Sequence, residues 1–261
     1  MSKNVDIHAT AIVDGAAELG VGVKVGPYSI VGADVVIGDR SEILAHAVVE
    51  GPTTLGSDNR IHQFASIGTP PQDQKYAGEP TRLEVGDRNT VREFVTMNRG
   101  TVDGGGTSRV GSDNLFMAYA HVAHDCTIGD NVVMANAATL AGHVEIDDFA
   151  IVGGLVAIHQ HVRIGESAIL GGGAMVSQDV PPYCMAAGDR ARLYGLNLVG
   201  LKRRGVDAST LSDLKSAYRV LFQSKLRRAE AIEQLKRDFA DSAEVGRMIR
   251  FVESSTRGVC R

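Results

Sequence analysis

Five of the eight histidines of this 261-residue chain fall in one stretch, as His121, His124, His143, His159 and His161. Histidine is the side chain whose charge changes most readily near neutral pH, and its neutral ring also binds metal ions. The cluster therefore fits two kinds of chemistry. One is a metal site, in which three nitrogen atoms converge on the ion at about 2.0–2.1 Å. The other is general acid–base catalysis, for which Asp125 would orient the neighbouring His124.

A period of six residues runs through most of the chain. An apolar residue recurs at every sixth position from Val13 to Ile67, from Val85 to Met97 and from Val110 to Val176, often followed by glycine. This period fits neither an α-helix nor a single strand, whose faces repeat at 3.6 and 2 residues. It predicts short strands joined by tight corners, with the apolar residue pointing inward and small residues or glycine at the bends. Three such sides close a triangular coil of about 18 residues, and about eight coils stack as parallel β-structure.

The coil length converts the histidine spacing into a position in space. His124 and His143 are 19 residues apart, His143 and His161 are 18 apart, and His143 and His159 are 16 apart. Each of these separations is close to one full coil. We therefore expect the five histidines to form a column along one side of the molecule, with neighbouring rings about 5–7 Å apart.

Breaks in the repeat predict how the chain is organised. The hexads are interrupted over about 69–82 and 98–109, and we expect both segments to be loops that leave the solenoid. Loops on a rigid scaffold are favoured places for a binding site. After residue 190 the apolar spacing becomes helical, with Asp207 as the expected N-cap of the first of three helices. The sequence predicts a β-solenoid over 1–190 and a helical domain over 191–261, which would cover the last coil.

The composition of the chain indicates which classes of partner it could bind and in which cellular compartment it would work. The net charge of −4 is unevenly spread, since Lys and Arg predominate after residue 190 and Asp and Glu before it. This basic end suits an acidic protein or a nucleotide diphosphate. Nucleic acid is not expected, because the basic residues lack interleaved aromatics and no nucleic-acid-binding motif occurs. Three cysteines without clustered spacing, no membrane-spanning run and no signal-peptide pattern predict a cytoplasmic protein.

Three motifs, in this order, carry a resemblance over nearly the whole chain. KYAGEPT (75–81), HVAHDCT (121–127) and GLKRRG (200–205) look like those of the acyl-carrier-protein–UDP-N-acetylglucosamine O-acyltransferases. The resemblance implies a mainly β fold, a left-handed parallel β-helix with a C-terminal α-helical domain. It also implies a homotrimer with its sites between subunits. The implied reaction, the first step of lipid A biosynthesis, moves a (3R)-3-hydroxyacyl chain from acyl-carrier protein to the 3-hydroxyl of UDP-N-acetylglucosamine. It needs no cofactor and no metal.

The resemblance also implies roles for single residues. His124 would be the general base, Asp125 would orient it, and the Gly142 N–H would bind the oxyanion. Two further groups are implied: residues that bind the UDP moiety, which are Asn197, Arg203 and Arg204, and residues along the acyl groove, which are Gly172 and Arg190. Other substrate contacts are expected from Gln72, Asp73, Lys75, His121, His143, His159 and Gln160. The chain departs from the family's frequent residues at Asn98, Arg190 and Val199.

Several alternatives stay open at the level of sequence. The acceptor could be a 3-amino sugar nucleotide, which would give an amide in place of an ester. A zinc hydratase of the γ-carbonic-anhydrase type would use the histidines as ligands, although the paired ligands of that class are separated by four residues and not by two. The protein could also be a structural solenoid without catalytic activity, in which the histidines would have no chemical role. The length of the acyl chain is also open, and Gly172 favours a long chain because it leaves the groove unobstructed.

Overall fold

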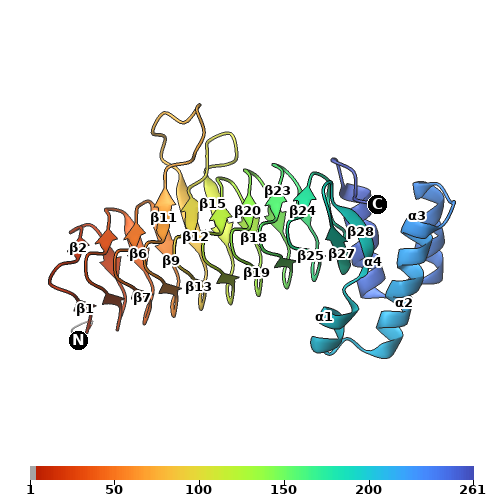
Figure 1. The fold of residues 1–261 in the computed structure, drawn as a ribbon, viewed down its shortest axis with the longest axis horizontal. Helices are drawn as coiled ribbons and strands as arrows, with labels where there is room; N and C mark the ends of the chain where they lie inside the picture. Colours follow the sequence, from red (N-terminus) through yellow and green to blue (C-terminus); the bar gives the residue numbers. More distant parts are fainter. Residues whose placement is uncertain (1–3) are drawn as a thin grey trace.

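Three sheets of parallel strands, one of them ending in an antiparallel strand, wind around one long axis and are followed by helices at one end, in a computed structural model that describes residues 4–261 (Figure 1). The first sheet consists of β1 (Asp6–Ile7), β4 (Lys24–Val25), β7 (Glu42–Ile43), β10 (Arg60–Ile61), β13 (Thr90–Val91), β16 (Leu115–Phe116), β19 (Val133–Met134), β22 (Ile151–Val152), β25 (Ile169–Leu170), β27 (Cys184–Ala187) and β28 (Arg192–Leu196). The second consists of β2 (Ile12–Val13), β5 (Ile30–Val31), β8 (Val48–Val49), β11 (Ser66–Thr69), β14 (Thr96–Asn98), β17 (His121–Val122), β20 (Thr139–Leu140), β23 (Ala157–Ile158) and β26 (Met175–Val176). The third consists of β3 (Glu18–Leu19), β6 (Val35–Ile37), β9 (Thr53–Leu55), β12 (Arg82–Val85), β15 (Thr107–Val110), β18 (Thr127–Ile128), β21 (Glu145–Ile146) and β24 (Arg163–Ile164).

The core follows the hexad period. Each predicted apolar position lies in a strand, and from Val25 to Val176 these side chains are buried against their counterparts in the coils above and below. Consecutive coils pair in parallel register, as in the pairing of Val122 with Leu140 and of Leu140 with Ile158. The prediction of a left-handed parallel β-helix is confirmed. Burial of a continuous apolar column stabilises the stack, since no single coil could bury its own face.

Glycine plays a different part from the one predicted for it. The corner position with positive φ is mostly taken by other residues, among them Asp125, His143 and His161, with φ of 61–62°. The prediction of small residues or glycine at the bends is therefore wrong for these corners. The hexad glycines are needed where coils approach closely: a Cβ at Gly26 would lie 2.9 Å from the backbone nitrogen of Ala45.

Two loops leave the same side of the solenoid (Figure 1). The first runs over 70–81, between β11 and β12, and the second over 99–106, between β14 and β15. The Lys75 and Asp103 side chains bring the two loops together, with 3.8 Å between Nζ and Oδ2. Both loops stand beside the coils that carry the histidines.

The C-terminal part begins with the antiparallel pair β27–β28 and continues as helices. These are α1 (Leu198–Arg203), α2 (Ala208–Tyr218), the π-helical turn η1 (Arg219–Gln223), α3 (Arg228–Asp238) and α4 (Ala243–Ser254). Asp207 caps α2 as predicted, by accepting a hydrogen bond from the Thr210 N–H. The short helix α1 is not among the three helices predicted. Within the described residues 4–261, no helix is both long and apolar enough to cross a bilayer.

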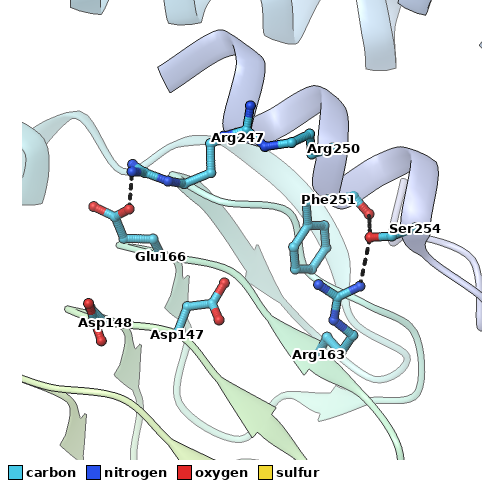
Figure 2. A pocket seen from close by; sticks show the side chains of 8 residues that line it. All are labelled: Asp147, Asp148, Arg163, Glu166, Arg247, Arg250, Phe251 and Ser254. Carbon is cyan, nitrogen blue, oxygen red and sulfur yellow. Dashed lines mark hydrogen bonds and ion pairs between the residues drawn. The ribbon is translucent and has the colours of Figure 1, made fainter. Parts of the chain in front are cut away.

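A pocket of about 520 Å³, lined by acidic and basic side chains, lies between helix α4 and the last coils (Figure 2). Arg163 lies over the Phe251 ring and donates to the Ser254 hydroxyl at 2.9 Å. Arg247 pairs with Glu166 across the pocket. The remaining lining includes Asp147, Asp148 and Arg250. The hydrogen bond of Arg163 and the ion pair of Arg247 therefore attach α4 to the solenoid.

Candidate active site

A second pocket, of about 670 Å³, lies between the two loops and the histidine side of the solenoid. Its lining comes from three places in the chain, namely the loop at 70–81, the loop at 99–106 and the corners of three successive coils. The lining residues are Gln72, Asp73, Gln74, Lys75, Thr101, Asp103, His124, His143, Gln160 and His161. Six of the residues expected from the sequence to act on substrate thus meet in one cavity.

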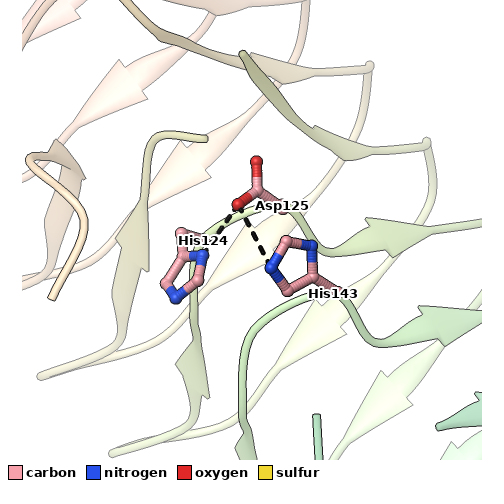
Figure 3. A group of neighbouring side chains, drawn as sticks. All are labelled: His124, Asp125 and His143. Carbon is pink, nitrogen blue, oxygen red and sulfur yellow. Dashed lines mark hydrogen bonds and ion pairs between the residues drawn. The ribbon is translucent and has the colours of Figure 1, made fainter. Parts of the chain in front are cut away.

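The His124 imidazole is held by the carboxylate that follows it in the chain (Figure 3). Its Nδ1 is 2.7 Å from Oδ2 of Asp125, whose side chain is only 1% exposed. Since Nδ1 faces the carboxylate, it carries the proton that is shared in this hydrogen bond. The other ring nitrogen, Nε2, then has a free lone pair, which is the arrangement that a general base requires.

Asp125 is fixed in turn by the second loop. Its Oδ1 accepts the Thr101 N–H at 2.8 Å and its Oδ2 accepts the Thr101 hydroxyl at 2.6 Å. The Asp125 N–H donates to the Ser108 hydroxyl at 2.8 Å. A Cβ at Gly104 would overlap the carboxylate, so the glycine-rich sequence of this loop lets it close over Asp125. Thr101 and Ser108 are not among the residues expected from the sequence, although both lie in the interruption of the repeat at about 98–109.

Gly142 lies directly under the His124 ring. A Cβ at this position would be 2.5 Å from Cε1 and 2.8 Å from Nε2 of His124, so any side chain here would collide with the imidazole. Among the described residues, the Gly142 N–H makes no hydrogen bond. An N–H that is free of protein partners is what an oxyanion donor needs.

The predicted histidine column contains three rings and not five. His124 and His143 have ring centroids 5.2 Å apart, and His143 and His161 stack at 4.4 Å. Burial lowers the pKa of His143, which favours its neutral form, while the nearby Asp125 carboxylate opposes this shift.

His121 and His159 lie outside this column. His121 is on strand β17, where it pairs in register with Thr139 and bonds Thr96 Oγ1 at 2.7 Å. His159 follows β23, and its Nδ1 is 3.3 Å from the Arg257 guanidinium. Both residues come a few positions before the nearest corner of their coil, so their side chains lie on another part of the coil. Burial lowers the pKa of His121, and the positive charge that His124 can carry lowers it further.

The residues expected at the UDP moiety do not line the pocket of their own chain. Asn197 caps α1 by accepting the Gly200 N–H at 3.0 Å, and it donates to the Ser167 carbonyl. Arg204 lies 3.6 Å over the Phe149 ring and pairs with Glu166. Arg203 is exposed and also absent from the pocket lining, and the same holds for the two residues expected along the acyl groove, Gly172 and Arg190.

Asn98, one of the departures from the resembled family, has a defined position here. It is 2% exposed, and its amide donates to Thr69 Oγ1 and to the Pro70 carbonyl, both at 2.9 Å. These bonds attach the start of the 70–81 loop to the end of β14. Val199 on α1 is exposed, and its side chain has no polar atom that could form a hydrogen bond.

His124, Asp125 and His143 offer ligand atoms within 4.8 Å of one another, a set that could hold a metal ion. However, His124 Nδ1 and Asp125 Oδ2 are 2.7 Å apart. Two ligands on one tetrahedral zinc are about 3.3 Å apart, given bonds of about 2.0–2.1 Å. The Asp125 Oδ2 atom is also engaged by the Thr101 hydroxyl. The group fits an oriented imidazole better than a zinc site, so the zinc hydratase is not favoured.

Comparisons with known proteins agree with this geometry. Residues 179–260 match the family model described as UDP N-acetylglucosamine O-acyltransferase, domain 2, and residues 16–51 and 107–142 match the bacterial transferase hexapeptide model. An acyl-[acyl-carrier-protein]–UDP-N-acetylglucosamine O-acyltransferase of Thermodesulfovibrio yellowstonii is 52% identical over 98% of this chain and 99% of its own.

Solved structures give the same result. LpxA from Acinetobacter baumannii is 42% identical with a TM-score of 0.95, over 98% of this chain and 99% of that one. The UDP-N-acetylglucosamine acyltransferase of Arabidopsis is 35% identical with a TM-score of 0.86, over 98% of this chain and 100% of that one. With a curated relative at 52% identity over nearly its full length, the chain belongs to the UDP-N-acetylglucosamine O-acyltransferase family.

Proposed function

We propose that this protein transfers a (3R)-3-hydroxyacyl chain from acyl-carrier protein to the 3-hydroxyl of UDP-N-acetylglucosamine, the first step of lipid A biosynthesis. The observation that carries the proposal is the His124 imidazole, held at 2.7 Å by the buried Asp125 carboxylate and open to the pocket at Nε2. The curated relative at 52% identity bears the name of this activity. A base, an oxyanion donor and a polar pocket are the parts that attack of a hydroxyl on a thioester requires.

The proposed reaction proceeds through one tetrahedral intermediate. His124 Nε2 takes the proton from the sugar 3-hydroxyl as that oxygen bonds to the thioester carbonyl carbon. The negative charge that develops on the carbonyl oxygen is stabilised by the Gly142 N–H. Collapse of the intermediate breaks the carbon–sulfur bond, and the imidazolium returns its proton to the departing thiolate. Asp125 stabilises the imidazolium and keeps the ring in place, without itself taking the proton.

The polar lining of the pocket would bind the acceptor sugar. Gln72, Asp73 and Lys75 from the first loop face His143 and Gln160 from the coils. We assign His121, on β17, and His159, just after β23, to the edge of the same sugar site. Gly172 and Arg190 would line the acyl chain.

A homotrimer would complete the site. In one chain, Asn197, Arg203 and Arg204 lie apart from the pocket, so a neighbouring copy would supply them to the UDP moiety. An exposed aromatic column at another corner of the solenoid offers a surface for such a neighbour. Its rings stack at 4.8–5.1 Å, and the column consists of Tyr28, His46, Phe64, Phe94 and Tyr119. Exposed apolar rings in a continuous row are typical of contact surfaces.

Acyl-carrier protein would dock at the basic end of the molecule. Arg190, Arg192, Lys202 and Arg203 are exposed there, close to the end of the solenoid. A positive surface of this kind attracts an acidic carrier and speeds its association. We place the reaction in the cytoplasm.

The test is to identify the product by mass spectrometry. Purified protein is incubated with a mixture of carrier-bound 3-hydroxyacyl chains and with both UDP-N-acetylglucosamine and its 3-amino analogue. We expect an ester of UDP-N-acetylglucosamine. Exclusive formation of the amide would replace this acceptor by the 3-amino sugar nucleotide, and the absence of any acylated sugar would refute the proposal. The same spectra give the preferred chain length.

Replacing Thr101 by valine should lower kcat by about tenfold to a hundredfold with little change in KM. The change removes the hydroxyl that donates to Asp125 Oδ2 at 2.6 Å, and a hydrogen bond to a charged group contributes about 1.5–3 kcal/mol. The backbone N–H of residue 101 still holds Oδ1, so the loop should stay in place. Steady-state kinetics decide this, with Thr101→Ser as the matched control. Equal losses in both variants would contradict a role for the hydroxyl.

A further inference from the structure

Within residues 4–261, the hydrogen-bond partners of the buried Arg99 guanidinium are neutral groups, two carbonyls and one hydroxyl. Arg99 is 8% exposed, and its NH1 donates to the carbonyls of Gly51 at 2.6 Å and Gly68 at 2.9 Å. Its NH2 donates to the Tyr76 hydroxyl at 3.2 Å, and its Nε is buried with no hydrogen-bond partner in the described part of the chain. Burying a cation among neutral acceptors is unfavourable for folding.

Arg99 joins the solenoid to the loop that carries the sugar-facing residues. The Tyr76 hydroxyl accepts from Arg99 and donates to the Glu79 carbonyl at 2.9 Å, so the connection crosses the loop. The Arg99 N–H bonds the Thr69 carbonyl at 3.0 Å, next to the Asn98 contacts described above. The start and the far end of the 70–81 loop are thereby attached to the residues that follow β14.

Tyr76 and the pocket residues before it form one turn. The Tyr76 N–H donates to the Asp73 carbonyl at 3.1 Å, and the Lys75 N–H donates to Asp73 Oδ1 at 2.9 Å. Fixing the Tyr76 ring therefore also fixes where Asp73 and Lys75 stand in the pocket wall. Tyr76 and Arg99 themselves are not part of that wall.

We infer that Arg99 and Tyr76 are a pair of positioning residues that hold the 70–81 loop in the conformation that binds the acceptor sugar nucleotide. This inference rests on the proposed function. Two residues further along, Thr101 holds the carboxylate that orients His124. One short segment, 98–101, thus supports both halves of the site, with Arg99 on the binding side and Thr101 on the catalytic side. The two sides should separate in kinetics.

The variant Tyr76→Phe tests the inference, because it removes the hydroxyl and keeps the ring. We expect KM for UDP-N-acetylglucosamine, and its Kd from calorimetry without the acyl donor, to rise about tenfold. The value of kcat at saturation should stay within about twofold, and Tm within about 2 °C. Amide hydrogen exchange should become faster across 70–81 and stay unchanged in the coils around Gly142. The matched control is Tyr218→Phe, at a tyrosine of α2 that packs on Phe222 and is not part of the pocket lining.

Other results would overturn the inference. An unchanged Kd in Tyr76→Phe would show that the hydrogen bond between Arg99 and Tyr76 does not govern binding. A fall in kcat at unchanged Kd would place Tyr76 in the chemical step. Arg99→Lys provides a second measurement, since an ammonium keeps the charge but lacks the planar fork that spans two carbonyls and a hydroxyl. It should raise Kd as Tyr76→Phe does. Failure of the proposed function would appear separately, as a wild-type protein that does not bind the sugar nucleotide at all.

Discussion

Replacement of His124 by alanine is expected to lower kcat by about 10²–10⁴-fold, the contribution of a single general base. The ring is the group in the pocket with a free basic nitrogen that is held in place by a buried carboxylate. Without it, the sugar hydroxyl must attack the thioester while still protonated. KM for both substrates should change little, because the loops and the neighbouring coils remain in place.

The fold should tolerate the loss of the His124 ring. Asp125 keeps its two hydrogen bonds from Thr101, so its buried charge is not left without partners. We expect Tm and oligomeric state close to those of the wild type, measured by calorimetry and light scattering. His8→Ala, at an exposed histidine of the first coil, is the control. Wild-type turnover in His124→Ala would remove the proposed mechanism.

Replacement of Gly142 by alanine should be almost as damaging, although it adds only one methyl group. The new Cβ would lie 2.5 Å from Cε1 of His124, well inside the contact distance of two carbon atoms. The imidazole must then swing away and lose its 2.7 Å hydrogen bond to Asp125. Misplacing a catalytic group by about 1 Å can lower the rate by about 10²-fold, so we expect a loss of that order in kcat.

A second hexad glycine supplies the control for Gly142→Ala. A Cβ at Gly32 would make only ordinary contacts, with 3.5 Å to its nearest neighbour, the Val49 carbonyl oxygen. Gly32→Ala should therefore keep full activity and a normal Tm. If Gly142→Ala were also fully active, or if its crystal structure showed an unmoved His124 ring, the proposed packing of the imidazole over this glycine would be wrong.

The periodic part of the fold could be predicted because a coil is determined locally. From Val13 to Val176, each hexad contains the inward-facing residue and the corner of its own side, so the strands appear where the period places them. The side of the coil on which each residue lies was harder to predict than the length of the repeat. His121 and His124 differ by only three positions, yet one lies on a strand and the other at a corner. Separation by one coil length therefore identified possible neighbours in the column without deciding which of them face the same way.

The supports of the site could not be predicted, because they depend on contacts across the two loops. Thr101 meets Asp125 only after the 99–106 segment has folded back over it, and Arg99 reaches Tyr76 across 23 positions of sequence. Neither contact follows a period. The roles of Asn197, Arg203 and Arg204 were inferred from resemblance alone, and they remain proposals that depend on a neighbouring copy.

The stacking of identical triangular turns has a consequence for how such a molecule can change in evolution. Deleting a single residue from one side would rotate every later side chain to a different face, and the buried column would be lost. Adding or removing a whole turn would preserve each environment and only move the helical end by about 4.8 Å relative to His124. Changes in reach along the axis are therefore expected in whole-turn steps, while changes in what is recognised fall to the two projecting segments, whose lengths the stacking does not restrict.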